Sequence, residues 1–378
     1  MTQASSEGLL YVKMSDRPTD PGAPLVVHVF PSFAVGGAQV RFAAVANHFG
    51  PAFRHIVVSL DGNLECRERL RPDLDAIFPV VAAPKGAMFG NARRFRRLLK
   101  AWRPDVLVTG NWGAIEFAMA NIPPVTRHIH IVDGFGPEER AVQIPRRVWM
   151  NRLVLARSEV VLPSRNLVRI ATEVWKLNPK RVVYVPNGID LTRFAAPDRA
   201  QRSEIPTIGT IAALREEKNL GRLLRAFAIA ASRTPGRLTI VGDGAERAGL
   251  TALAAELGVA DRVLFTGHRD DTPALYAGFD VFALSSDTEQ MPLSLIEAMA
   301  CGLPAASTDV GDVRSMLPPE QDGFVVPLSD EALAEALTAL LRDRALRLRL
   351  GAANLAKATR DFADTAMFER YRTLWTGS

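Results

Sequence analysis

Residues 288–304 read TEQMPLSLIEAMACGLP, and this stretch decides the interpretation of the whole chain. The run LSLIEAMA has the composition of a helix and is apolar or small at every position except Glu297. Proline is favoured in the first turn of a helix, so Pro292 predicts a helix start and places Glu289 in the loop before it. Because backbone N–H groups are open and the helix dipole is positive at such a start, the stretch predicts an anion site.

Glu297 is expected to be enclosed on most sides by the apolar helix that carries it. An unpaired buried carboxylate is costly, so Glu297 requires a partner or a ligand. Glu289, eight positions earlier, adds a second carboxylate close to the anion site. A nucleotide-sugar would use all three features: amides for its diphosphate, and carboxylates for the hydroxyls of its sugar and its ribose.

Segments typical of buried strands alternate with segments typical of helices from residue 25 to the end of the chain. Such alternation predicts parallel sheets that are covered by helices on both faces. The expected fold class is therefore α/β, with two doubly wound, Rossmann-like domains that face a cleft. The predicted strands cover residues 25–30, 55–60, 76–81, 106–109, 160–163 and 182–185 in the first half, and 207–211, 238–241, 263–266, 281–283, 304–307 and 323–326 in the second.

The domain boundaries follow from where these two sets of segments begin and end. Residues 1–24 are polar, contain Pro and Gly, and are interpreted as a flexible N-terminal tail. We expect residues 25–195 to form the first domain and residues 196–360 the second. Residues 361–378 hold a final predicted helix.

The composition is that of an ordinary globular protein with room for two cores: 378 residues, 48% apolar and 23% charged. Cys66 and Cys301 are far apart and lack metal-ligand spacing, which excludes a disulfide framework and a cysteine zinc site. The N-terminus lacks the layout of a secretion signal, and no apolar run approaches the roughly 18–20 residues of a spanning helix. We therefore expect a cytoplasmic protein, attached at most to a membrane surface.

The net charge of +5 is unevenly distributed along the chain. Residues 1–190 carry 25 Lys and Arg against 16 Asp and Glu, and the excess gathers in two clusters. The second cluster is interleaved with apolar residues and Trp149, so it could contact an anionic membrane surface or an anionic acceptor. A solvated helix face is an equal alternative, and neither cluster belongs to a nucleic-acid module, so no nucleic-acid partner is expected. The clusters are Arg93, Arg94, Arg96, Arg97, Lys100 and Arg103, then Arg140, Arg146, Arg147 and Arg152.

Glycines follow predicted strands in both halves. Gly36 and Gly37 come after the first strand and open a helix, which lets the backbone approach a ligand closely. The pattern is not G-x-G-x-x-G, so a nicotinamide dehydrogenase is discounted. Gly242 follows a strand of the second half. A plain strand-to-helix turn is the alternative at both places.

Arg215 and Lys218 lie between a predicted strand and a helix that Asn219 is expected to cap. Both cations should therefore lie at the C-terminal edge of the sheet, where open α/β folds bind ligands. Two cations there would neutralise a diphosphate as its bond to a sugar breaks. The alternative is an ordinary surface pair that Glu216 and Glu217 satisfy.

The run RHIHIVDGFG is predicted to be a strand that ends in a glycine-rich loop. Alternation places His128 and His130 on one face of that strand. His130 or Asp133 could orient or deprotonate an acceptor hydroxyl, while a structural histidine is the alternative. Asp73 and Asp75 have the spacing of a metal-binding pair, but acids this close are common on surfaces, so no metal site is predicted.

Together these motifs resemble the retaining glycosyltransferases of family 4, the group 1 transferases with two Rossmann-like domains of the GT-B type. The similarity spans nearly all of the chain after residue 24. Glu289 and Glu297 match the E-x7-E element of that family, which is the most specific of the motifs. Arg215 and Lys218 match its phosphate-binding cation pair, and Gly36-Gly37 matches its N-terminal glycine loop.

The resemblance implies a role for each of these residues. Glu289 would hold hydroxyls of the transferred sugar and Glu297 those of the ribose, while Arg215 and Lys218 would stabilise the leaving diphosphate. His130 and Asp133 would serve the acceptor side. The resemblance also implies a UDP- or GDP-sugar as co-substrate, no metal, no other cofactor, and retention by front-face attack in which the donor's own phosphate accepts the acceptor proton. The further donor-binding residues would be Gly36, Gly37, Gly242, Gln290, Met291, Pro292 and Leu293.

Two positions depart from the family pattern. The family commonly has Gly-Phe after the first Glu, where this chain has Gln290 and Met291. Loss of that glycine restricts the turn, and Gln290 adds an amide that could bind a sugar hydroxyl. A family histidine often precedes the glycine of the acceptor-side loop, where this chain has Asp133. By the same resemblance, the last helix would cross back to pack on the first domain.

The resulting expectation is a transferase that moves a hexose from a nucleotide diphosphate sugar to a hydroxyl acceptor. A saccharide or lipid-linked saccharide of the bacterial envelope would suit the basic first domain. Two alternatives stay open: a nucleotide-sugar epimerase or phosphorylase on the same fold, and a catalytically silent scaffold that binds nucleotide-sugars. Clustered charges are costly to maintain without a use, which argues against the silent scaffold.

Overall fold

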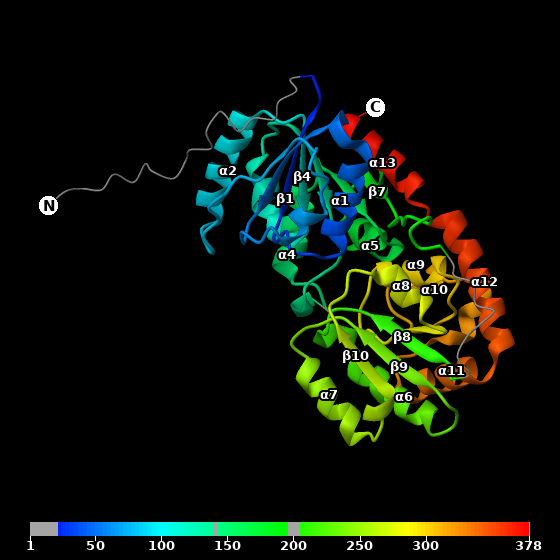
Figure 1. The fold of residues 1–378 in the computed structure, drawn as a ribbon. Helices are drawn as coiled ribbons and strands as arrows, with labels where there is room; N and C mark the ends of the chain where they lie inside the picture. Colours follow the sequence, from blue (N-terminus) through cyan, green and yellow to red (C-terminus); the bar gives the residue numbers. More distant parts are fainter. Residues whose placement is uncertain (1–21, 140–141, 196–204, 378) are drawn as a thin grey trace.

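The computed structural model describes residues 22–139, 142–195 and 205–377, which form two α/β units stacked one on the other (Figure 1). The predicted tail, residues 1–24, lies almost entirely outside the described residues. Each unit is built on one parallel sheet with helices packed against it.

The first sheet has seven strands in the order β3-β2-β1-β4-β5-β6-β7, and every neighbouring pair is parallel. The central strand β1 is buried along its whole length. Its alternate residues pack on opposite faces, Val26 on one and Val27 and Val29 on the other. The strands are β1 (Leu25–Phe30), β2 (Arg54–Ser59), β3 (Ala76–Ile77), β4 (Val106–Gly110), β5 (Arg127–Ile131), β6 (Glu159–Leu162) and β7 (Val182–Tyr184).

The second sheet has six strands in the order β10-β9-β8-β11-β12-β13, again all parallel. The prediction of an α/β fold with two doubly wound domains is therefore confirmed. In each sheet the strand order reverses beside the first strand of its set, β1 or β8, and open α/β folds bind ligands at such a reversal. The strands are β8 (Thr207–Ile211), β9 (Arg237–Val241), β10 (Val263–Gly267), β11 (Val281–Leu284), β12 (Ala305–Thr308) and β13 (Val325–Val326).

The helices follow the strands as the sequence pattern predicts. The helix α9 begins and ends at the limits of the predicted run LSLIEAMA, and α6 begins directly after Asn219, its predicted cap. The helices of the first unit are α1 (Gly37–Phe49), α2 (Met88–Trp102), α3 (Ile115–Ala120), α4 (Pro145–Val154) and α5 (Arg165–Arg169). Those of the second are α6 (Leu220–Ala231), α7 (Arg247–Glu256), α8 (Thr272–Ala277), α9 (Leu293–Ala300), α10 (Val313–Met316), α11 (Asp330–Arg342) and α12 (Arg344–Asp361).

The last helix, α13 (Asp364–Thr376), returns to the first unit, where Figure 1 shows it in red beside α1. Its apolar face, with Phe368 and Trp375, shares a core with Val26 and Val45. The chain crosses between the units at two adjacent places, since Ile189 and Ala363 form a backbone bridge. The boundaries given above stay a prediction. No helix in residues 22–139, 142–195 and 205–377 is long and apolar enough to cross a membrane.

Candidate active site

A cleft of about 710 Å³ lies between the two units. It brings together most of the residues that the sequence selected, although they are spread over more than 250 positions of the chain. From the first unit it is lined by Gly36, Gly37 and Asp133, and from the second by Arg215, Lys218, Gly242, Glu289, Met291, Pro292, Leu293 and Glu297.

Glu289 lies in the loop between β11 and α9, one strand away from β8. Its Oε1 atom lies 2.6 Å from Lys218 Nζ and accepts a 2.8 Å hydrogen bond from Ser286 Oγ. The loop is closely supported from behind, because a Cβ on Gly311, where φ is +55°, would lie 2.2 Å from the Glu289 carbonyl oxygen. A fixed loop holds the carboxylate at one position on the cleft wall.

Glu297 projects from the second turn of α9 into the same cleft. The fully buried Tyr276 donates a 2.7 Å hydrogen bond from its hydroxyl to Glu297 Oε2. Burial raises the pKa of Glu297 to about 7, against smaller lowering effects of Tyr276, Arg193 and Arg69. The expected partner therefore exists, and Glu297 also lines the cleft.

The two cations follow β8, as predicted. Asn219 caps α6, because its side chain accepts a hydrogen bond from the backbone N–H of Arg222. Arg215 is exposed on the cleft wall, whereas the Lys218 side chain is 24% exposed and held by Glu289. Lys218 thus combines with a carboxylate of the site rather than forming a plain surface pair.

Gly242 follows β9, and the backbone at Ala212 approaches it closely, as a glycine at this position allows. Its φ is +132°, and a Cβ would lie 1.9 Å from the Ala212 carbonyl oxygen. Any side chain would collide with backbone that cannot move aside. The turns after β8 and β9 can therefore pack together beneath the cleft.

The N-termini of two helices face each other across the cleft. Gly36 is the N-cap of α1, and Pro292 is the N-cap of α9, which begins at Leu293. A Cβ on Gly37 would lie 3.6 Å from Leu293 Cδ1. Both helix starts line the same cleft, and the open N–H groups of a helix start favour an anion nearby.

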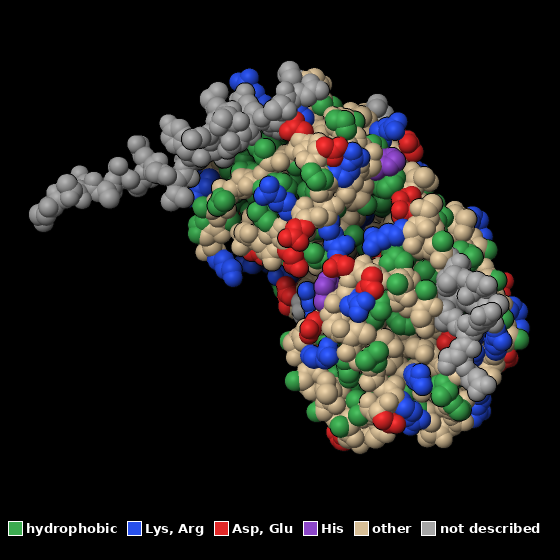
Figure 2. All heavy atoms as spheres, in the orientation of Figure 1, with side chains coloured by type: hydrophobic (Ala, Val, Ile, Leu, Met, Phe, Trp, Pro, Cys, Tyr) green, Lys and Arg blue, Asp and Glu red, His purple; other side chains and the backbone are tan. Residues whose placement is uncertain are grey.

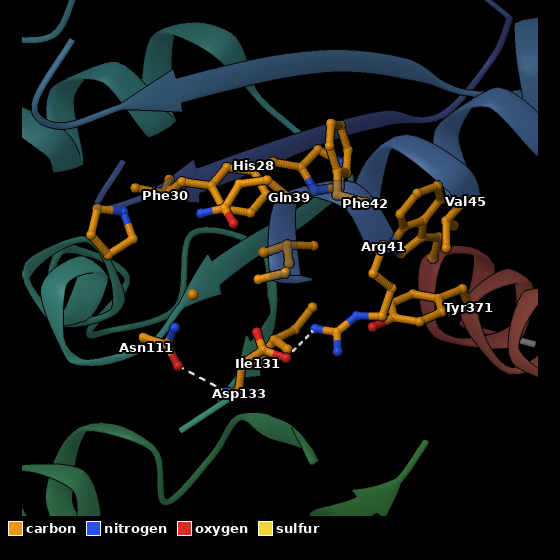
Figure 3. Close-up of a pocket in the computed structure, with 16 residues that line it drawn as sticks. His28, Phe30, Gln39, Arg41, Phe42, Val45, Asn111, Ile131, Asp133 and Tyr371 are labelled. Carbon is orange, nitrogen blue, oxygen red and sulfur yellow. Dashed lines mark hydrogen bonds and ion pairs between the residues drawn. The ribbon is translucent and has the colours of Figure 1, made fainter. Parts of the chain in front are cut away.

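Arg41 is a residue that sequence reasoning missed. Its guanidinium, 5% exposed, lies 2.6 Å from Asp133 Oδ1 and donates a 2.8 Å hydrogen bond to Asn187 Oδ1. Figure 3 shows it pointing from α1 between Asp133 and Tyr371, beside an enclosed cavity of about 40 Å³. Burial acts to lower the pKa of Arg41, but Asp133 and Tyr371 raise it above its usual value. A lone arginine on the apolar face of α1 was the available signal.

The same network reaches the second unit. Asn187 Nδ2 donates a 3.0 Å hydrogen bond to the carbonyl oxygen of Met291, the residue just before the N-cap of α9. Arg41 and Asn187 therefore connect Asp133 on one wall of the cleft to the Glu289 loop on the other.

His130 lies elsewhere than expected. It is 1% exposed, outside the cleft lining, and its Nδ1 is 2.7 Å from Thr109 Oγ1. His128 shares the same hydroxyl at 2.8 Å, as alternation along β5 predicts. Burial lowers the pKa of both histidines to about 3, which is unsuited to accepting a proton from a substrate. Only Asp133 of the two acceptor-side candidates lines the cleft.

Gln290 also faces away from the cleft. Its Oε1 accepts hydrogen bonds from Ser164 Oγ (3.1 Å) and Asn166 Nδ2 (3.2 Å), both in the first unit. Beside it, the buried Asp312 accepts hydrogen bonds from the backbone N–H groups of Arg165 (2.6 Å) and Asn166 (3.1 Å). Gln290 thus joins the two units, a contact that its neighbours in sequence do not reveal.

Within the described residues, no group of three or more His, Cys, Asp or Glu side chains is placed to hold a metal ion. Asp73, considered above with Asp75, lies 2.5 Å from Arg71 in a surface ion pair. Cys66 and Cys301 are both buried, and neither forms a disulfide.

Two protein families match consecutive parts of the chain. Residues 35–193 match the family described as Glycosyltransferase Family 4, and residues 194–356 match the one described as Glycosyl transferases group 1. The break between the two matches falls where the chain passes from the first sheet to the second.

Curated relatives align over part of their length. The chain is 33% identical over 215 residues to the lipopolysaccharide core biosynthesis glycosyltransferase LpsE of Rhizobium meliloti, covering 55% of this chain and 62% of that protein. It is 29% identical over 233 residues to the N-acetyl-alpha-D-glucosaminyl L-malate synthase of Bacillus anthracis, covering 59% and 61%. The chain therefore spans less than two thirds of the length of these relatives.

Solved structures share the whole architecture. HepE from Anabaena, in complex with UDP and glucose, has a TM-score of 0.78 at 16% identity and covers 93% of this chain and 99% of its own. Sucrose-phosphate synthase from Thermosynechococcus elongatus has a TM-score of 0.77 at 21% identity, covering 94% and 100%. At such identities the likeness shows the fold, which is the two-domain GT-B fold. With the two family matches over residues 35–356, the chain belongs to the family 4 glycosyltransferases.

Proposed function

We propose that this protein is a retaining glycosyltransferase that moves a hexose from a nucleotide diphosphate sugar to a hydroxyl acceptor. The observation that carries the proposal is that Glu289, Lys218 and Glu297 line one cleft with the glycine start of α1. The relatives support it by name, since they include a lipopolysaccharide core glycosyltransferase, and HepE was solved with UDP-glucose. Synthesis of bacterial envelope polysaccharide or glycolipid is the process we propose.

The cleft offers a place for each part of such a donor. Glu297 would accept hydrogen bonds from ribose hydroxyls, and Glu289 from hydroxyls of the hexose. The facing starts of α1 and α9, with Arg215 and Lys218, would hold the diphosphate between them. Negative charge grows on the diphosphate as its bond to the sugar breaks, so these groups would bind the transition state more tightly than the ground state.

We further propose that transfer proceeds with retention and without a divalent metal. The acceptor oxygen would form the new bond on the face from which the diphosphate leaves, and its proton would pass to a phosphate oxygen of the donor. Arg215 and Lys218 would supply the positive charge that a metal provides in other enzymes. Asp133, fixed by Arg41 on the wall of the cleft, would orient the acceptor hydroxyl that reaches the donor sugar.

The donor is proposed to be a UDP- or GDP-sugar and the acceptor a saccharide or lipid-linked saccharide. The names of the relatives point to different acceptors, among them L-malate, D-inositol 3-phosphate and a diphosphoundecaprenol-linked sugar. They therefore support the reaction type but leave the acceptor to be argued from the cleft itself.

We also propose a location on the cytoplasmic side of the membrane, with the first unit on an anionic surface. Near the start of α4, Val142 is 77% and Trp149 is 59% exposed, and Arg146 beside them is exposed too. Other cluster members are engaged: Arg94 and Arg96 donate to backbone carbonyls. Arg147 is held by Glu138 and Glu139, while Arg140 lies outside the described residues.

A transfer assay separates this proposal from its rivals. The protein is incubated with UDP-, GDP- and ADP-hexoses, with and without a mixture of alkyl glycosides, and products are followed by mass and by NMR. We expect release of nucleoside diphosphate together with a new glycoside of retained anomeric configuration, unaffected by EDTA. Conversion of donor without acceptor would indicate an epimerase, dependence on free phosphate a phosphorylase, and no conversion a silent scaffold.

A further inference from the structure

A second cavity, of about 530 Å³, lies beside the donor cleft and shares Glu289 with its lining. Glu289 belongs to the lining of both hollows, so its carboxylate stands at the point where they meet. The cavity takes its walls from both units. Its uncharged lining includes Phe135, Gly136, Gln143 and Asn166 from the first unit and Thr288 and Gly311 from the second.

The walls are held in place by contacts at the cavity itself. Gln290 accepts hydrogen bonds from Ser164 and Asn166, and Asp312 accepts two from the backbone at the start of α5. The first unit is therefore fastened to the loop that carries Glu289. A molecule in this cavity would be positioned against the same loop as the donor sugar.

The charge of the cavity wall is predominantly negative among the residues that the structure describes. Its five carboxylates face one arginine, Arg169, which already donates a 3.1 Å hydrogen bond to Asn166 Oδ1 and lies 3.6 Å from Glu173. Figure 2 shows acidic side chains in red, beside basic ones in blue, where the two units meet. The carboxylates belong to Glu139, Glu216, Glu217, Asp287 and Glu289.

Three of these carboxylates are paired with cations that do not belong to the lining of this cavity. Glu139 is 2.7 Å from Arg147, and Asp287 is 2.7 Å from Arg222. Glu289 is paired with Lys218. Those cations are thereby engaged, and a phosphate or carboxylate entering the cavity would meet acceptor oxygens of like charge.

We propose that this cavity holds the acceptor and that the part it takes is an uncharged saccharide. The inference rests on the proposed function and adds the substrate class. Carboxylate and amide oxygens accept hydrogen bonds from sugar hydroxyls, and the half-buried ring of Phe135 offers a surface for the apolar face of a sugar ring. The same wall disfavours phosphorylated or acidic sugars, because its carboxylates repel a second negative charge.

Saturation-transfer NMR tests the proposal with simple sugars in place of the natural acceptor. The full chain is measured with and without UDP against methyl glycosides of glucose, galactose, mannose and N-acetylglucosamine, each beside its 6-phosphate. Glucose and galactose are also compared with their uronates. We expect at least one neutral glycoside to bind, and its charged counterpart to bind at least about tenfold more weakly, since one like charge at this range is worth roughly that factor.

Two variants with the same change of charge test whether the preference for the neutral sugar arises at the cavity wall. Glu217→Lys, in the cavity wall, should reduce the preference for the neutral sugar about tenfold while UDP affinity stays the same. Glu256→Lys, at the exposed end of α7, should leave the preference unchanged. Binding of no neutral glycoside, equal binding of the charged sugars, or an unaltered preference in Glu217→Lys would overturn the inference. Failure to bind UDP would instead count against the proposed function.

Discussion

Lys218 Nζ lies 2.6 Å from Glu289 Oε1, although the two residues are 71 positions apart in the chain. The pair connects the turn after β8 to the loop before α9, and its side chains are only 24% and 11% exposed. Each charge compensates the other while both face the cleft. The pairing holds a cation where we place the leaving diphosphate and a carboxylate where we place the sugar.

Substitution of these two residues should have different effects. Lys218→Met should weaken UDP binding by about 10- to 100-fold, roughly 1.5–3 kcal/mol, because it removes a charged hydrogen-bond donor to the phosphate. Glu289→Gln should leave UDP affinity within a few-fold but lower the transfer rate at least about 100-fold. Calorimetry and the transfer assay measure the two quantities.

A matched control for Lys218→Met is Lys357→Met, which removes a similarly exposed ion pair with Asp361 on α12, outside the cleft lining. This control should change neither the UDP affinity nor the transfer rate. Equal losses of UDP affinity in Lys218→Met and Glu289→Gln would contradict the division of roles.

The raised pKa of Glu297 predicts that donor binding depends on pH. Ribose hydroxyls donate to the ionised carboxylate, and with a pKa of about 7 this form is lost as the pH falls below 7. Affinity for a UDP-hexose, which has no titrating group in this range, should fall about tenfold between pH 8 and pH 6. Glu297→Gln should bind more weakly at pH 8 and show no such dependence. An unchanged slope in the variant would rule out Glu297 as the titrating group.

The raised pKa of Glu297 also makes the stability of the folded protein depend on pH. Because the folded pKa lies above the value of 4.5 for an unperturbed Glu, the stabilising contribution is present at low pH and is lost as the pH rises through about 7. The melting temperature of Glu297→Gln minus that of the unaltered protein should therefore be larger at pH 8 than at pH 5. Thermal unfolding at the two pH values measures the difference.

Gly242→Ala should destabilise the second unit by at least about 2 kcal/mol, because its φ of +132° and the Ala212 carbonyl at 1.9 Å leave no room for a Cβ. Gly249→Ala is the matched control, since that position lies within α7 and has open space around it. It should be neutral or stabilise by up to about 1 kcal/mol. Chemical unfolding monitors both, and comparable losses would contradict the role given to the turn after β9.

Gln290→Ala and Asp312→Ala should loosen the junction between the units. Each removes two hydrogen bonds to the start of α5, so small-angle scattering should detect a larger radius of gyration. UDP affinity should change little, while transfer should fall about tenfold because Glu289 shares the loop. Asp309→Ala, which removes a surface ion pair with Arg314, should change neither the radius of gyration nor the transfer rate. An unaltered radius and rate in both variants would show that the contacts do not position the loop.

The exposed apolar and basic residues of α4 predict binding to anionic vesicles. Arg146→Ser combined with Trp149→Ala should reduce co-sedimentation with phosphatidylglycerol vesicles several-fold at low salt, because each basic residue near the surface contributes about 1 kcal/mol. Arg152→Ser would be a poor choice, since that guanidinium donates to the carbonyls of Val174 and Trp175. Absence of binding by the unaltered protein at low salt would leave α4 as a solvated face.

Much of the fold could be predicted because its signals are local. The limits of β1, β8, α6 and α9 depend on uninterrupted apolar runs and on cap or proline residues next to them. Spacing likewise placed Glu289 in a loop and Glu297 inside a helix. β2, β3 and β6 end earlier than predicted, because apolar residues continue into the loops that follow them.

The contacts that complete the site could not be predicted, because they join residues far apart in the sequence. Arg41 meets Asn187 across 146 positions, and Gln290 meets Ser164 across 126. Strand alternation placed His130 on the correct face with His128 but gave no information about depth, and that face is covered by Thr109 and Ser158.

The most direct test of the account is calorimetric binding of UDP-, GDP- and ADP-hexoses to the full chain, first without divalent metal and then with it. The account predicts a clear preference for one donor, unaffected by metal and lost or strongly weakened in Lys218→Met. Binding of no nucleotide-sugar under either condition, or binding that is unchanged in Lys218→Met, would contradict it.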